Sequence, residues 1–135
     1  MALGITKVSG TIESGESVAA SALEWASDTG GTVLNAGSGE YYAMINLQVS
    51  VTFNASGTKD AEVHVRKSCD DGTTKDTAEA GTYLGTIKCS AGNTVTRTFP
   101  VYDFDYLDVG VKNLDTSYTI TYTAIYDGYK LTGMS

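Results

Sequence analysis

The sequence is poor in several residue types on which functional sites and non-globular folds depend. Its 135 residues include one histidine, one tryptophan, one proline and two cysteines. Charged residues make up only 19% of the chain, too little for a disordered chain or a coiled coil. No apolar run approaches the roughly 18 residues of a membrane-spanning helix. The length fits one domain covering residues 1–135.

Positively charged residues are also scarce. Nine lysines and arginines stand against 16 acidic residues, which gives a formal net charge of −7. The basic residues are scattered, so no phosphate-binding patch is visible and we expect no nucleic-acid partner. Residues Met1 to Gly4 lack the basic and apolar regions of a signal peptide, so we expect synthesis in a cytosol and no membrane partner.

The abundant residues are those of strands and turns. The chain has 15 glycines, 19 threonines, 12 serines and nine tyrosines. Threonine and tyrosine fit a pleated surface, and glycine supplies tight turns. The clearest strand covers residues 41–54, where a period of two places the odd-numbered residues from Ala43 to Phe53 in the core.

The same periodicity predicts several further strands, separated by turns rich in Gly, Asn and Asp. They cover residues 5–12, 61–66, 83–89, 94–101, 106–111 and 118–126. Pro100 has no N–H for a ladder, so its strand ends, bulges or lies at an edge there. Short strands without long helices between them predict an all-β, antiparallel β-sandwich that is jelly-roll-like.

Two regions are less regular. Residues 18–25 could share a helical face but are too few to distinguish a helix from a strand. Residues 27–40 are rich in Gly, Asn and Asp and predict a long exposed loop between the sheets.

The single histidine argues against two kinds of site. His64 alternates with Val63 and Val65, which places it on the outer face of a strand. One histidine without matched cysteines cannot build a usual zinc site. No Gly-x-Ser-x-Gly motif accompanies it, so a hydrolase is disfavoured. We therefore expect no catalytic residues, no cofactor and no metal.

Two acidic groups carry sharper alternatives. Asp70, Asp71 and Asp76 could hold Ca²⁺, but their spacing does not match an EF-hand and such residues also suit a hairpin loop. Asp103 and Asp105 share a strand face and could form a glycosidase pair. Solubility and chain turning explain them more simply, so we assign neither group a chemical role.

The two cysteines are expected to be free thiols. Cys69 and Cys89 flank a predicted hairpin around residues 70–81, and symmetric pairing of that hairpin does not place them opposite each other. A reducing cytosol also disfavours a disulfide.

Tyrosines crowd the C-terminal third of the chain. Tyrosine is favoured at protein interfaces because its ring buries area while its hydroxyl still finds a partner. The residues predicted to form an interface are Tyr118, Tyr122, Tyr126, Tyr129 and Leu131. A sugar-binding platform in which Trp25 joins the tyrosines is the alternative.

Two segments together resemble small all-β structural proteins of tailed bacteriophage virions. The first, Val63 to Thr73, reads strand, Ser, Asp-Gly, Thr; the second, Phe104 to Asn113, reads aromatic, Leu, x, Val, x, Val, x, Asn. The resemblance implies a non-enzymatic capsid decoration protein, or a tail or connector component, made in the host cytoplasm. Its implied partners are the major capsid protein or tail proteins, with other copies of the chain in the assembly. Carbohydrate-binding and receptor-binding sandwiches share the pattern and remain the alternative.

Overall fold

The computed structural model describes residues 4–36, 40–68 and 81–132, and the side chain of Asp103 is not described. Its elements are β1 (Gly4–Val18), β2 (Leu23–Trp25), the 3-10 helix η1 (Ala26–Asp28), β3 (Leu34–Asn35), β4 (Tyr41–Thr52), β5 (Ala61–Ser68), β6 (Thr82–Ile87), β7 (Thr94–Phe104), β8 (Tyr106–Asn113) and β9 (Ile120–Thr132). No helix in these ranges is long and apolar enough to span a membrane.

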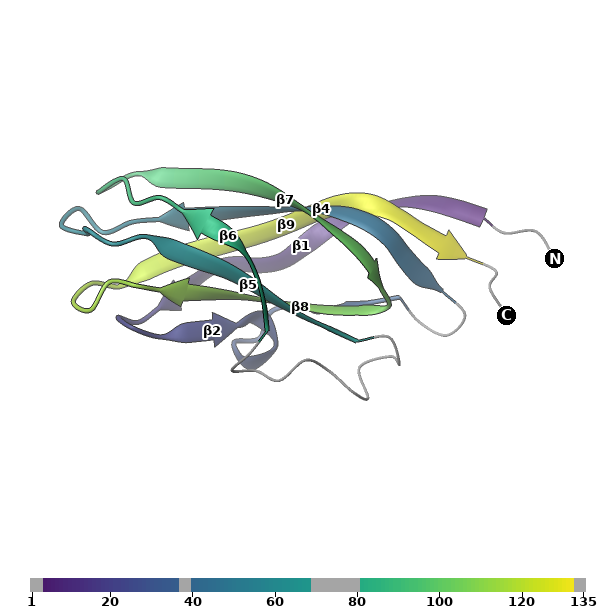
Figure 1. The fold of residues 1–135 in the computed structure, drawn as a ribbon, viewed down its shortest axis with the longest axis horizontal. Coiled ribbons are helices and arrows are strands. Elements are labelled where there is room, and N and C mark those ends of the chain that lie inside the picture. The colour runs from purple at the N-terminus through teal and green to yellow at the C-terminus, as the bar shows by residue number, and fades with distance from the viewer. Residues whose placement is uncertain (1–3, 37–39, 69–80, 133–135) are drawn as a thin grey trace.

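The strands form two antiparallel sheets that lie face to face (Figure 1). Sheet A has the order β1-β9-β4-β7, and sheet B has the order β2-β8-β5-β6 with β3 also paired to β8. Apart from the short β3, the strands pair as in a long hairpin, namely β1 with β9, β2 with β8, β4 with β7 and β5 with β6. The chain therefore folds as a long hairpin rolled into two layers. This is the jelly-roll topology, which confirms the predicted fold class.

The predicted inward face of β4 is confirmed over most of its length. Ile45, Leu47, Val49 and Val51 are fully buried, and Phe53 is 3% exposed. The prediction is wrong for Ala43, which is only half-buried.

The cause is a β-bulge. The pairing of β4 with β9 shifts between Tyr42 and Met44, which inverts the alternation beyond that point. Tyr42 therefore takes the buried position and stacks on Phe104 with ring centroids 5.1 Å apart.

The loop predicted over residues 27–40 is only partly exposed, which is a second correction. Leu34 and Ala36 are each 3% exposed, and β3 pairs Leu34 with Leu107 of β8. The ambiguous residues 18–25 form the end of β1, a turn and β2. Long-range pairing with β8 decides both regions, and a single short segment carries no signal for it.

Proline is tolerated where the sequence predicts. Pro100 lies within β7, which is the edge strand of sheet A beside β4. An edge strand needs ladder donors on one side only, so the missing N–H leaves the pairing with β4 intact.

Candidate binding surface

The outer face of sheet A presents side chains in rows that cross all four strands. Residues directly opposite each other in antiparallel strands point to the same side of a sheet. The register therefore defines each row across β1, β9, β4 and β7. Along the strands these rows change in chemistry from one end of the face to the other.

The rows where β4 ends and β7 begins carry hydroxyl groups. Thr52 bonds to Thr94 and Ser50 bonds to Thr96, each with 2.7 Å between the hydroxyl oxygens. Thr121 of β9 pairs with Thr52 from the other side and extends the same row. This end of the face is polar and uncharged.

The rows near the chain termini carry large apolar side chains. One row runs from Lys7 through Tyr129 and Met44 to Tyr102, and the next contains Ile5, Leu131 and Tyr41. Together, the apolar residues of these two rows form a surface that we call the apolar end: Ile5, Tyr41, Met44, Tyr102, Tyr129 and Leu131. Ile5 is 72% exposed, Tyr102 is 55% exposed and Tyr129 is 45% exposed. Exposed apolar clusters are typical of interaction surfaces.

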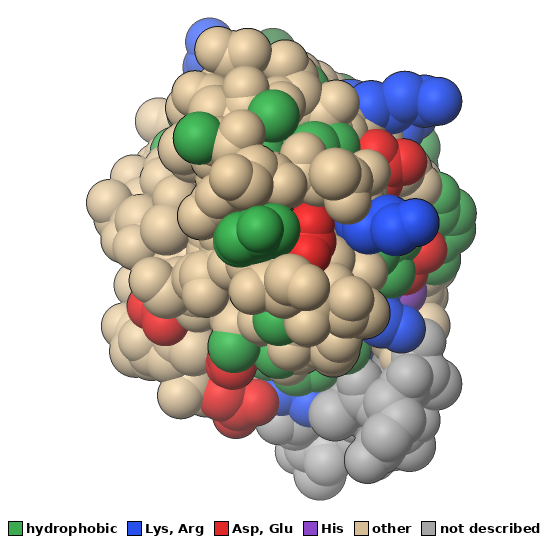
Figure 2. All heavy atoms as spheres, turned by 90° about the vertical axis from the view of Figure 1, so that its left-hand side faces the viewer, with side chains coloured by type: hydrophobic (Ala, Val, Ile, Leu, Met, Phe, Trp, Pro, Cys, Tyr) green, Lys and Arg blue, Asp and Glu red, His purple; other side chains and the backbone are tan. Residues whose placement is uncertain are grey.

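The opposite end of the molecule offers no comparable cluster in the view from that side. Figure 2 shows the end that lies on the left of Figure 1, where the described chain turns between strands. Backbone and uncharged polar side chains dominate the view, and hydrophobic side chains are scattered. The apolar end lies at the other end of sheet A, where β1 begins and β9 ends (Figure 1).

A hollow of about 410 Å³ lies on the outer face between the hydroxyl rows and the apolar end. This polar hollow is lined by Ser9, Asn46, Gln48, Thr98, Ile125, Tyr126 and Asp127. Asn46 Nδ2 donates to Asp127 Oδ1 over 3.2 Å, and Gln48 Nε2 donates to Thr98 Oγ1 over 3.5 Å. Ile125 is 40% exposed. The hollow thus combines hydrogen-bond donors and acceptors with the apolar surfaces of Ile125 and Tyr126.

The predicted interface residues do not form one surface. Tyr129 and Leu131 belong to the apolar end, whereas Tyr118 is 39% exposed in the turn before β9. Tyr126 is half-buried and packs against the core. The interface prediction is wrong for Tyr122, which is only 1% exposed. Its hydroxyl donates a hydrogen bond to the Glu24 carbonyl over 3.3 Å.

The physical reason is the position of β9 in the middle of sheet A. Its even-numbered residues face sheet B, so the ring of Tyr122 becomes core. Burial raises the pKa of the Tyr122 hydroxyl, with smaller contributions from Glu13 and Asp108. Burial, followed by Tyr126 and Glu40, raises the pKa of Tyr42 to about 12. Both phenols are neutral at physiological pH.

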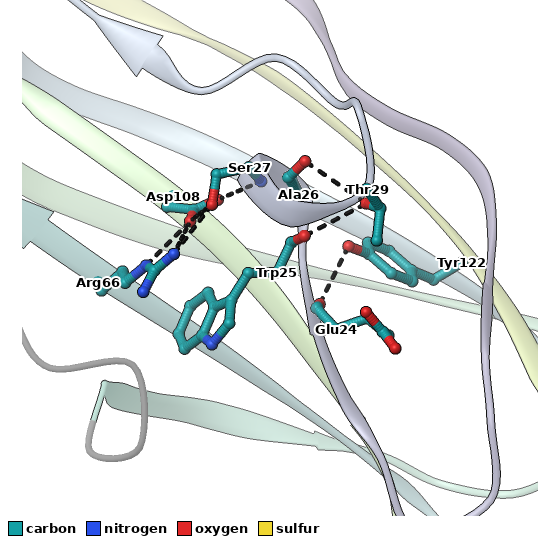
Figure 3. A network of polar contacts seen from close by, with 8 residues as sticks. All are labelled: Glu24, Trp25, Ala26, Ser27, Thr29, Arg66, Asp108 and Tyr122. Atoms are coloured by element: carbon teal, nitrogen blue, oxygen red, sulfur yellow. Dashed lines mark hydrogen bonds and ion pairs between the residues drawn. The ribbon is translucent and has the colours of Figure 1, made fainter.

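Trp25 is not available as a sugar platform, which corrects the alternative in which it contacts a glycan. Its side chain is 4% exposed and the Arg66 guanidinium lies 4.7 Å from its ring centroid. Arg66 Nε and Nη2 each lie 2.9 Å from Asp108 Oδ2 (Figure 3). Asp108 also accepts hydrogen bonds from the hydroxyl and backbone N–H of Ser27. This network fixes η1 against sheet B.

The other candidate side chains lie apart from one another. His64 is on the outer face of sheet B, as predicted, with Nε2 3.2 Å from Glu62 Oε1 and its ring 5.6 Å from that of Tyr83. Asp105 is half-buried between β7 and β8. No group of three or more His, Cys, Asp or Glu that could hold a metal ion occurs among the described residues.

Several predicted positions lie outside the described part of the chain. These are Asp70, Asp71 and Asp76 of the calcium alternative, Cys69 of the thiol pair, and the side chain of Asp103. Cys89 is half-buried. Burial, followed by the charges of Asp60 and Asp115, raises the pKa of its thiol.

Sequence reasoning missed the surface on sheet A. Its residues come from positions far apart in the chain, and only the register places Tyr102, Met44 and Tyr129 in one row. The alternation within residues 41–54 assigns Met44, Asn46 and Gln48 to the outward side. That signal identifies their face, but it says nothing about which residues of β1, β7 and β9 lie beside them.

No protein-family model matches the chain. No curated protein matches it either. A structure of xylanase 10B from Clostridium thermocellum, containing its CBM22-1 and GH10 modules with xylohexaose, is similar over 69% of this chain and 17% of that one. The identity is 14% and the TM-score is 0.39. The chain thus spans less than a fifth of that protein.

A second structure, of Bacillus endospore appendages that form disulfide-linked pili, is similar over 99% of this chain and 88% of that one. The identity is again 14%, and the TM-score is 0.34. These scores are low, and neither likeness transfers a function to this chain.

Proposed function

We propose that the chain is a non-enzymatic structural subunit that attaches to another protein through the apolar end of sheet A. The observation that carries the proposal is the row formed by Tyr129, Met44 and Tyr102 on three adjacent strands. Two exposed tyrosines flank a methionine there, and tyrosine and methionine are enriched at protein interfaces.

The rigidity of the platform supports this role. Met44 and Tyr129 lie on the two central strands, β4 and β9, whose inner faces are buried in the core. A surface held on paired strands loses little conformational freedom on binding, which favours a stable contact. The second row, with Ile5, Tyr41 and Leu131, extends the apolar area toward the termini.

The finer assignment is a capsid decoration protein that binds the head lattice of a tailed bacteriophage virion. The resemblance of the segments at residues 63–73 and 104–113 to virion proteins supports it. The partner would be the major capsid protein, with further copies of the chain in the assembly. A tail or connector component would use the same apolar end on a different lattice.

The test combines attachment to particles with matched variants. Purified particles that lack the chain are mixed with the parent or with a Tyr102→Ser/Tyr129→Ser double variant, and the bound protein is measured by mass spectrometry. We expect the parent to attach and the double variant to lose at least tenfold in affinity, about 1.4 kcal/mol.

The control is a Thr94→Ser/Thr121→Ser double variant, which changes the same outer face at its hydroxyl end. It should attach like the parent, and both double variants should have the parent's far-UV circular dichroism, which reports the backbone fold. Sedimentation of the isolated chain then separates self-association from attachment to the lattice. Failure of the parent to attach, or equal attachment of the Tyr102→Ser/Tyr129→Ser variant, would overturn the proposal.

A carbohydrate-binding module is the second candidate. The polar hollow favours it, because its lining mixes amide, carboxylate and hydroxyl groups with an exposed isoleucine.

A further inference from the structure

The geometry points to a binding site for a neutral saccharide in the polar hollow of sheet A. This inference rests on the second candidate function and not on the assembly role, because the side chains that carry it lie outside the apolar end. They are Asn46, Gln48, Thr98, Ile125 and Asp127. A volume of about 410 Å³ lies within the range of small-ligand sites.

The polar groups of the hollow suit a ligand with many hydroxyls. Asp127 is held by the side chain of Asn46 across 3.2 Å, so the carboxylate and the amide stand side by side. Each of these groups has further hydrogen-bonding capacity beyond that one bond. A carboxylate beside an amide can accept from one sugar hydroxyl and donate to the next.

A second polar pair lies one row away. Gln48 Nε2 and Thr98 Oγ1 are 3.5 Å apart, at the outer limit of a hydrogen bond. Because this bond is weak, a ligand hydroxyl can replace it at little cost. The pairs on β4 are two residues apart, so both face the ligand from the same side of the strand.

The apolar groups suit the C–H face of a sugar ring. Ile125 lies between Gln48 and Thr11 in its row and is 40% exposed. Tyr126, which is half-buried, also lines the hollow. Ligand sites combine such apolar contacts with a few placed polar groups, which fix the orientation of the ligand.

The negative charge of the hollow makes an anionic ligand unfavourable. Asp127 is the one charged side chain in the described lining, so the hollow disfavours a phosphate, a sulfate or a uronic acid. One carboxylate is also too few for a calcium site, which takes six to eight oxygen ligands. A neutral, polyhydroxylated ligand satisfies both the donors and the acceptors.

The experiment is a titration of the folded chain followed by NMR of the Asn46 and Gln48 side-chain amides. The probes are hexasaccharides of xylose, glucose and N-acetylglucosamine, with a polygalacturonate fragment as the anionic comparison. We expect at least one neutral hexasaccharide to shift both amide signals at millimolar concentration and the anionic fragment to shift neither.

Matched variants locate the site. Asp127→Ala removes a charged hydrogen-bonding partner and should weaken binding roughly tenfold or more. Thr96→Ala, on the same outer face in a hydroxyl row, should bind like the parent. Ile125→Ser tests the apolar contact without altering the carboxylate, and it should also weaken binding.

Three outcomes would overturn the inference. They are no shift with any neutral hexasaccharide, binding of the anionic fragment alone, and equal binding by the parent and the Asp127→Ala variant. Because the apolar end is unchanged in these variants, attachment to particles can succeed or fail independently of saccharide binding.

Discussion

Trp25 lies directly against Gly110, the residue opposite it in the pairing of β2 with β8. A Cβ atom at Gly110 would stand only 2.7 Å from the indole ring. The glycine therefore makes room for the ring, and Arg66 covers the ring with its guanidinium. The one tryptophan of the sequence therefore packs at the β2 edge of sheet B.

Gly110→Ala should lower the free energy of unfolding by about 1–3 kcal/mol, the usual cost of overpacking. Urea denaturation measures the change. Lys112→Ala, on the same strand but exposed, is the control and should have little effect. Combining Gly110→Ala with Trp25→Leu should cost less than the sum of the two single changes, and strict additivity would contradict the contact.

Val49→Asp should destabilise the protein by several kcal/mol because it places a charge in the core of β4, where Val49 is fully buried. Ser50→Asp is a matched control, since Ser50 is the next residue and faces outward. Thermal unfolding of both variants gives the comparison. Equal stability of Val49→Asp and the parent would show that the assigned inward face is wrong.

Arg66→Met should lower the free energy of unfolding by about 3 kcal/mol, because it leaves the fully buried carboxylate of Asp108 without its cation. Ser27 would still donate to that carboxylate. Chemical denaturation measures the loss. Pairing Arg66→Met with Asp108→Leu should recover part of it, whereas no recovery would contradict the importance of the ion pair.

Asp115 should make stability fall in acid. Its carboxylate accepts hydrogen bonds from the backbone N–H groups of Ser117, Thr58 and Tyr118. The bonds from Ser117 and Thr58 are the main reason why its pKa lies below the ordinary value of 3.8. The unfolded chain therefore takes up the proton first as the pH falls, so this stabilisation is present above about pH 5 and is lost in stronger acid.

Urea denaturation at a series of pH values tests the role of Asp115. Asp115→Asn should be less stable than the parent at neutral pH, and the difference should narrow as the pH falls through 3.8 and below. Asp28→Asn, at an exposed site on η1, is the control. A difference that stays constant with pH would contradict the assignment.

The two thiols should be free in freshly made protein. Masses of alkylated protein prepared with and without reductant should then be equal, whereas a disulfide would withhold two alkyl groups from the unreduced sample. In a Cys69→Ser variant, Cys89 should react with iodoacetamide more slowly than free cysteine at the same pH, because burial raises the pKa of its thiol. Equally fast alkylation would contradict that burial.

Deleting residues 131–135 would disturb sheet A itself as well as the apolar end. Leu131 and Thr132 are not a loose tail, because they belong to β9 and pair with Ile5 and Gly4 of β1. Removing them would shorten a central strand of sheet A. Leu131→Ser is the better probe of attachment, since it alters the apolar end while keeping the strand paired.

The longer strands and most of their inward faces follow from the sequence by itself. Residues 45–53 alternate so regularly that a strand with one buried side is the only way to bury their apolar side chains. Pro100 likewise limits its strand to an end, a bulge or an edge, and β7 is an edge strand. Both conclusions rest on local chemistry, which a single segment of chain contains.

Only the tertiary structure decided which strands are neighbours and what they present together. Tyr122 could serve a surface or a core equally well from its sequence pattern, and the central place of β9 buries it. The same pairing aligns Tyr129 with Met44 and Tyr102, and Asp127 with Asn46. The periodicity of one strand specifies a face but not a partner, because partners are set by contacts between distant segments.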